Sequence, residues 1–86
     1  MTKGSWAATD ADSVIVAADT YRGEIAIQHL SGDAMYIAFG EAAVVGEGIL
    51  ISSTAAFIRI SDHRARLAIH AICDTGESAS GGYQTG

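Results

Sequence analysis

Three histidines are the residues of this chain best suited to chemistry. They are His29, His63 and His70. Zinc and metalloprotease sites need histidines at short fixed spacings, such as H-x-H, H-x-x-x-H or H-E-x-x-H, and none of these occurs in the sequence. His29 ends one expected strand and His70 lies inside another, so a contact across a sheet is the arrangement that could bring two imidazoles together. The spacing alone predicts no metal site.

The single cysteine, Cys73, is predicted to be a buried and unreactive thiol. No His, Lys or Arg stands next to it to lower its pKa, and it falls on the apolar side of its expected strand. One cysteine also excludes an internal disulfide. The short glycine groups Gly46-x-Gly48 and Gly81-Gly82 do not have the length of a phosphate-binding loop, and no G-x-S-x-G motif is present.

Asp10, Asp12 and Asp19 could offer carboxylates to calcium, but they lack the spacing and the closing Glu of an EF-hand loop. Acidic residues at strand ends that discourage pairing with neighbouring sheets explain them equally well. The sequence therefore predicts no catalytic residue, no metal and no cofactor, and we expect the chain not to be an enzyme.

The composition predicts one small domain that binds protein. The chain has 86 residues, of which 17% are charged, against about 25% in an average domain. Its net charge is −5, and its five basic residues are too dispersed for the basic patch that nucleic acid or an anionic membrane needs. No apolar run has the length of a membrane span, and residues 1–6 do not resemble a signal peptide. We therefore expect that the chain binds neither nucleic acid nor a membrane. We also expect that it is synthesised in a cytoplasm.

Short apolar segments separated by Gly, Asp and Ser predict an all-β fold, a compact antiparallel β-sandwich of jelly-roll-like type with six to seven short strands. Ser31-Gly32-Asp33 is a turn signal, so Leu30 and Met35 are expected to face each other as the arms of a hairpin. For residues 65–73 a helix capped by Ser61-Asp62 is the alternative, but strict alternation over this segment favours a strand. The expected strands cover residues 13–18, 24–30, 35–39, 48–51, 57–60 and 65–73.

The alternation also predicts the core. The residues expected inside are Ile25, Ile27, Met35, Ile37, Phe39, Ile49, Ile51, Ile58, Ile60, Leu67 and Ile69.

Both ends of the chain are polar, each with one isolated aromatic residue. We therefore expect an N-terminal arm over residues 1–12, a sandwich domain over 13–73 and a flexible tail over 74–86. Trp6 and Tyr83, the aromatic residues of the two arms, are the candidate anchors at a protein interface.

Three segments in the middle of the chain resemble a pattern found in small virion proteins of tailed bacteriophages. They are Arg22-Gly-Glu-Ile-Ala-Ile-Gln-His-Leu-Ser31, Met35-Tyr-Ile-Ala-Phe-Gly-Glu41 and Gly48-Ile-Leu-Ile51. The chain departs from this pattern in two places. His29 stands where the pattern usually has Asn, and Ser53-Thr54 stands where it usually has a Pro-Gly turn. The resemblance implies a β-sandwich on the virion and no catalytic site.

On this resemblance we expect a decoration (cement) protein that binds and stabilises the capsid shell. Its partners would be the major capsid protein or other virion proteins, and its place the capsid surface. A neck, tail or fibre component of the virion is the alternative, followed by a carbohydrate-binding β-sandwich.

We also expect a homo-oligomer, or else a chain that is only marginally stable until it docks on a partner. So small a core without disulfide or metal has little net stability, and no proline blocks the sheet edges. A trimer is favoured because the resemblance implies local threefold positions on a shell.

Overall fold

In the part of the chain that the structure describes, the alternating segments form eight strands, and one short 3₁₀ helix precedes the seventh. The computed structural model describes residues 3–54 and 56–85. The predicted antiparallel β-sandwich is confirmed, with eight strands in place of six to seven. The elements are β1 (Lys3–Ala8), β2 (Ser13–Val16), β3 (Ile25–Gly32), β4 (Met35–Phe39), β5 (Ile49–Ile51), β6 (Phe57–Ile60), η1 (His63–Arg66), β7 (Ile69–Cys73) and β8 (Ala79–Thr85). None of the helices in the described part of the chain has the length and apolar content to cross a membrane.

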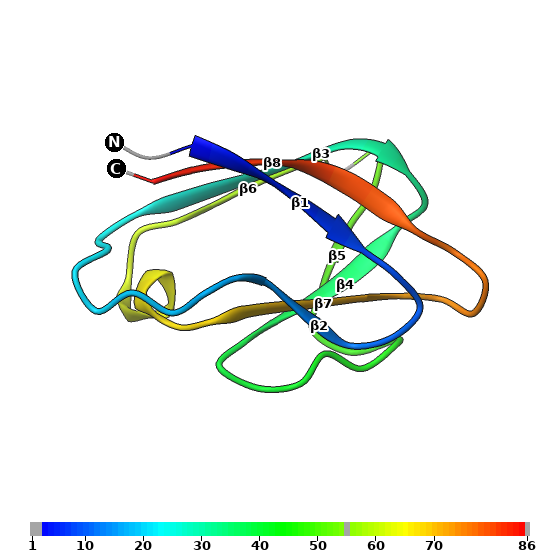
Figure 1. Ribbon diagram of the computed structural model, residues 1–86, viewed down its shortest axis with the longest axis horizontal. Helices are drawn as coiled ribbons and strands as arrows, with labels where there is room; N and C mark the ends of the chain where they lie inside the picture. Colours follow the sequence, from blue (N-terminus) through cyan, green and yellow to red (C-terminus); the bar gives the residue numbers. More distant parts are fainter. Residues whose placement is uncertain (1–2, 55, 86) are drawn as a thin grey trace.

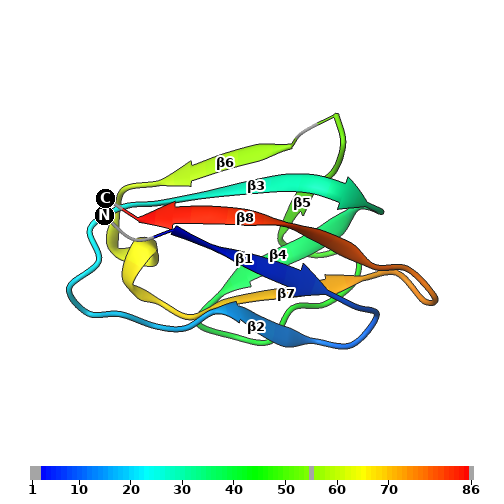
Figure 2. The ribbon, with the colours of Figure 1, turned by 45° about the horizontal axis from the view of Figure 1, so that its top comes forward.

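The strands pair in a nested order. Sheet A has the order β1-β8-β3-β6 and sheet B the order β2-β7-β4-β5, and the two sheets lie face to face (Figure 1). The first strand therefore pairs with the last, the second with the seventh, the third with the sixth and the fourth with the fifth. Figure 2 shows the four strands of sheet A side by side. An eight-stranded double sheet of this kind is a jelly roll.

The two ends of the chain are strands of sheet A. β1 pairs with β8 from Lys3↔Gln84 to Ala8↔Ala79, and β8 pairs on its other side with β3. The prediction of polar arms outside the sandwich is therefore wrong for residues 3–8 and 79–85. The reason is geometric: β8 is a central strand in which small residues let neighbouring groups approach closely, and main-chain hydrogen bonds on both edges hold it.

The expected hairpin between Leu30 and Met35 is also wrong. β3 belongs to sheet A and β4 to sheet B, so the turn between them crosses from one sheet to the other. Gly32 adopts a φ of 94°, which favours glycine, and the Asp33 N–H donates to the carbonyl of Ser78 at 2.7 Å. These features turn the chain out of sheet A.

Residues 65–73 combine both interpretations of their sequence. Asp62 caps η1, since its side chain accepts from the Arg64 N–H at 2.9 Å, and the strand begins only at Ile69. The hydrogen bonds from Arg64 lower the pKa of the Asp62 carboxyl. Because Leu67 lies between the two elements, it is 36% exposed and its predicted place in the core is wrong.

The core lies between the sheets and follows the predicted alternation. Ile25, Ile27, Met35, Ile37, Ile51, Ile60 and Ile69 are buried as predicted, and Phe39, Ile49 and Ile58 are partly buried against them. Cys73 is buried as predicted, and the structure adds Trp6, Ala8, Val16, Ala65, Ala71 and Ala79 to the core.

Candidate functional site

Trp6 is a core residue. It lies in β1 facing sheet B, is 5% exposed, and its indole N–H donates to the carbonyl of Gly82 at 3.0 Å. The indole also packs near the His29 ring, with 6.4 Å between centroids. The prediction of an interface anchor is therefore wrong for Trp6, because its side chain is already used within the sandwich.

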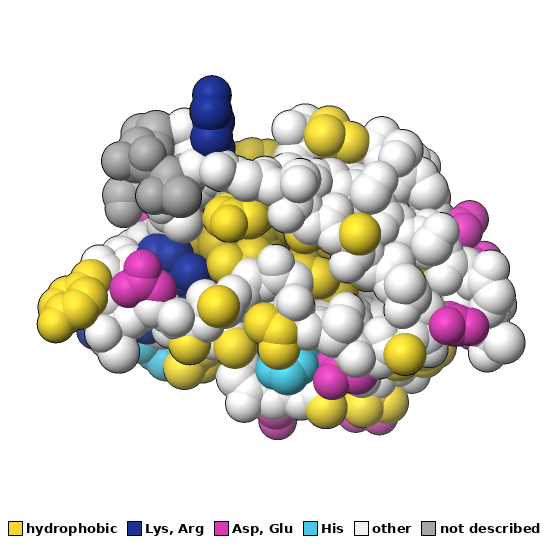
Figure 3. Space-filling view, in the orientation of Figure 1, with side chains coloured by type: hydrophobic (Ala, Val, Ile, Leu, Met, Phe, Trp, Pro, Cys, Tyr) yellow, Lys and Arg dark blue, Asp and Glu magenta, His cyan; other side chains and the backbone are white. Residues whose placement is uncertain are grey.

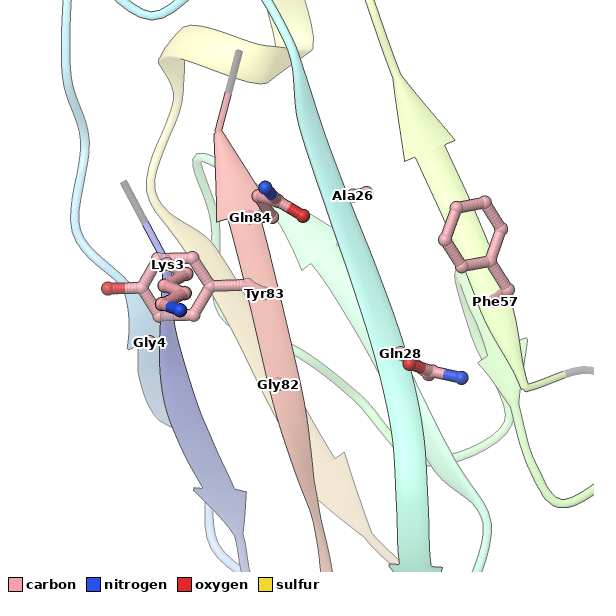
Figure 4. Close-up of a pocket in the computed structure, with 8 residues that line it drawn as sticks. All are labelled: Lys3, Gly4, Ala26, Gln28, Phe57, Gly82, Tyr83 and Gln84. Carbon is pink, nitrogen blue, oxygen red and sulfur yellow. The ribbon is translucent and has the colours of Figure 1, made fainter. Parts of the chain in front are cut away.

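Tyr83 lies in β8 next to β1 and is partly buried against the core. Its ring covers Gly4, since a Cβ on Gly4 would lie 2.7 Å from the ring (Figure 4). Trp6 and Tyr83 thus sit on neighbouring strands of one sheet and not on separate arms. The anchoring role of Tyr83 stays a prediction.

The histidines do not meet. His29 is in sheet A and His70 in sheet B. His29 is 5% exposed and its Nε2–H donates to the carbonyl of Asp33 at 2.8 Å, which fixes its tautomer. His70 Nδ1 lies 3.2 Å from Asp12 Oδ1. Within residues 3–54 and 56–85 no three His, Cys, Asp or Glu side chains are placed to hold a metal ion.

Cys73 ends β7 inside the core, as predicted, and is fully buried. Burial raises the pKa of its thiol, and the negative charges of Asp33, Glu77 and Asp10 raise it further. A thiol with a raised pKa is a poor nucleophile at neutral pH.

The outer face of sheet A carries both polar and apolar side chains and contains a shallow hollow (Figure 4). The hollow, of about 190 Å³, crosses the sheet at Gly82 and Ala26, with Lys3 on one side and the ring of Phe57 on the other. Phe57 is 60% exposed, and the amide of Gln28 lies beside it. An exposed ring beside an amide, with an ammonium group across the hollow, can bind a small polar molecule that has one apolar side.

The outer face of sheet B is apolar instead. Its outward side chains include Tyr36, which pairs with Leu50 of β5 and with Ile72 of β7. Val14 extends the same face on the edge strand β2 and is 52% exposed. We call these four residues the sheet B face: Val14, Tyr36, Leu50 and Ile72.

The sequence analysis missed the sheet B face, although a signal for it was present. The strands β4, β5 and β7 read M-Y-I-A-F, I-L-I and I-H-A-I-C, with apolar residues on both alternating sides. Nearly continuous apolar runs are typical of strands that are covered on both faces. One face of sheet B covers the core, so the other is the candidate interaction surface.

The basic side chains gather at one end of the molecule, where Glu24 and Asp62 pair with Arg59 and Arg64. All five basic residues lie toward the end that carries η1 and the first residues of β1 and β3, whereas Asp10, Asp33, Asp74 and Glu77 lie in the turns at the opposite end. Hydrogen bonds join these turns, from the Gly76 N–H to Asp10 and from the Ser78 N–H to Asp33. In Figure 3 the dark blue side chains accordingly lie at the left, and most magenta ones at the right and along the lower margin.

Comparisons of the chain with protein-family models, with curated proteins and with solved structures give no match.

Proposed function

We propose that the chain is a structural, non-enzymatic protein of a phage virion, which binds the capsid shell and stabilises it as a decoration protein. The jelly roll supports this, because viral capsid proteins often use it, as do lectins and cupins. A fold alone does not specify a function. The observation that carries the proposal is the difference between the outer face of sheet A, where Lys3, Gln28 and Gln84 accompany the exposed ring of Phe57, and the apolar outer face of sheet B. Such a module places one face against a support and the other in water.

The resemblance of residues 22–51 to small virion proteins also supports the proposal. These residues form β3, β4 and β5, which supply strands to both sheets. We further propose a homotrimer formed through sheet edges, since β1 and β6 border sheet A and carry no proline. Sedimentation of the isolated chain measures this; a monodisperse monomer would contradict it.

The proposal predicts that the chain is part of purified particles of the phage that encodes it, detectable by mass spectrometry. Adding the purified chain to particles assembled without it should raise their melting temperature, because a ligand that binds only the intact shell stabilises it. An equal amount of an unrelated acidic protein is the control. Absence of the chain from purified particles would contradict the proposal, and electron microscopy separates a shell position from the neck, tail or fibre.

A saccharide-binding module is the second candidate, favoured by the hollow on sheet A. An exposed Phe57 ring beside the Gln28 amide offers an apolar contact and hydrogen bonds together, which suits the two kinds of surface on a sugar ring.

This second candidate predicts a specific hit on a glycan array that Phe57→Ala removes. Leu30→Ala is the matched control, because Leu30 is 66% exposed and does not line the hollow. Both variants should keep the melting temperature of the wild type, since neither residue is part of the core. An array without a specific hit would exclude this function.

A further inference from the structure

The sheet B face has the anatomy of a docking surface. Tyr36 lies at its centre, between Leu50 on one neighbouring strand and Ile72 on the other. Val14 and Leu50 on the two edge strands are 52% and 46% exposed. Aromatic residues surrounded by aliphatic ones are common at the centres of protein interfaces.

Sheet A also exposes apolar side chains, Phe57 and Leu30, but polar and charged residues surround them. One row across the outer face of sheet A consists of Lys3, Gln84, Ala26 and Arg59, which are register partners. Arg59 there forms an ion pair with Glu24 at 2.7 Å. The equivalent row across sheet B contains Ile72, Tyr36 and Leu50.

The loop between β4 and β5 enlarges the apolar surface. Asp12 holds this loop, because its Oδ1 accepts from the Ala43 N–H at 2.8 Å and also contacts His70 Nδ1. Ala43 is buried as a result, while Val44 and Val45 are 49% and 40% exposed. The loop residues are thus held in place before any partner binds, which lowers the entropy lost on binding.

Among the described residues, the side chains around this surface that carry a fixed charge are acidic, and His70, on the same face, contacts Asp12 Oδ1 at 3.2 Å. Asp12 lies beside β2, and Glu41 and Glu47 lie in the β4–β5 loop. The five basic residues lie on sheet A, in η1 or in the segment that leads into β3. A two-fold contact between two sheet B faces would bring six carboxylates together, three from each copy. Like charges therefore oppose a second copy as the occupant.

We propose that the sheet B face, with Val44 and Val45, docks on a different protein whose contact surface has an apolar centre and a rim of Lys and Arg. The inference rests on the proposed function, in which that protein belongs to the capsid shell. The apolar residues supply most of the affinity, and the carboxylates select and orient the partner.

Binding of labelled variants to particles assembled without the chain tests the proposal. We expect Leu50→Glu to weaken binding about 100-fold, and the pair Glu41→Lys and Glu47→Lys to weaken it about tenfold and to reduce its salt dependence. The matched controls are Leu30→Glu and Glu77→Lys, which lie outside this surface and should bind as the wild type does. Melting curves identify any variant that has lost its fold, and Val14→Lys then replaces Leu50→Glu.

Equal binding by Leu50→Glu and the wild type, with the fold intact, would overturn the proposal. Failure of the wild type to bind particles would instead overturn the proposed function.

A second measurement tests the docking surface separately from the proposed function, because it needs no shell. In sedimentation, the double variant Glu41→Gln and Glu47→Gln should self-associate more than the wild type does. Adding Leu50→Glu to this double variant should remove the extra self-association. Self-association of the wild type through this face would overturn the choice of partner, and no added association in the Gln pair would overturn the role of the carboxylates.

Discussion

Replacing Gly81 by alanine is expected to prevent the chain from folding. Gly81 lies in the central strand β8, opposite Trp6 of β1 and His29 of β3. A Cβ there would overlap the carbonyl oxygen of Gln28 and would lie 2.7 Å from Cζ2 of Trp6. Because main chain cannot move aside without breaking the pairing of β8 with β3, we expect a loss of more than about 4 kcal/mol, a large value for one substitution.

Gly82→Ala is the matched control for this prediction. At Gly82 the added Cβ would meet only the carbonyl oxygen of Gly4, at an ordinary contact distance of 3.4 Å. Its stability should stay within about 1 kcal/mol of the wild type. Urea unfolding followed by circular dichroism measures both variants. A cooperative Gly81→Ala transition at the wild-type midpoint would show that β8 is not placed as described.

Removal of the Arg22 guanidinium is expected to have the second largest effect. Arg22 is 6% exposed, and its Nη1 and Nη2 donate at 3.0 Å to the carbonyls of Ala17 and Leu67, while Nε donates to that of Ala65. One side chain thus joins the segment before β3 to the residues of η1 and those after it. Arg22→Met would leave three carbonyls without this donor, at a cost of about 3–5 kcal/mol.

Arg22→Lys should recover little of this stability, because an ammonium group cannot reproduce the planar, divergent donors of a guanidinium. Arg66→Met is the control, since Arg66 is exposed and lies on the neighbouring 3₁₀ helix. It should change stability by less than about 0.5 kcal/mol. Equal midpoints for Arg22→Met and Arg66→Met in urea unfolding would refute the role given to Arg22.

The sequence predicted the strands in which apolar and polar side chains alternate. It did not predict β1 and β8, whose pairing depends on main-chain hydrogen bonds. Ile25 and Ile27 are buried on one side of β3 because the period of two places them there. Residues 79–85 carry two glycines and one large apolar side chain, so composition suggested a flexible tail. Close approach to Gln28 and Trp6, which makes glycine necessary at Gly81, depends on residues far away in the sequence.

The candidate surface was predictable only in part. Apolar residues on both sides of a strand indicate that both of its faces are covered, and the sequences of β4 and β5 have this pattern. Which side faces the core, however, depends on the partner strand and on the turn at Gly32 that moves the chain to the other sheet. The prediction for Trp6 was wrong for the same reason. An isolated aromatic residue in a polar segment has no neighbours in sequence that show where it packs.

The nested pairing of the strands has a consequence for the order of events during synthesis. Lys3 of β1 pairs with Gln84 of β8, so the first strand to be made has no partner until the last one exists. Closing so long a loop has an entropic cost, and folds dominated by distant contacts form slowly. While the chain grows, Trp6 and the inner side of β1 have no strand to cover them, and a chaperone that shields the nascent N-terminal segment would raise the yield of folded protein.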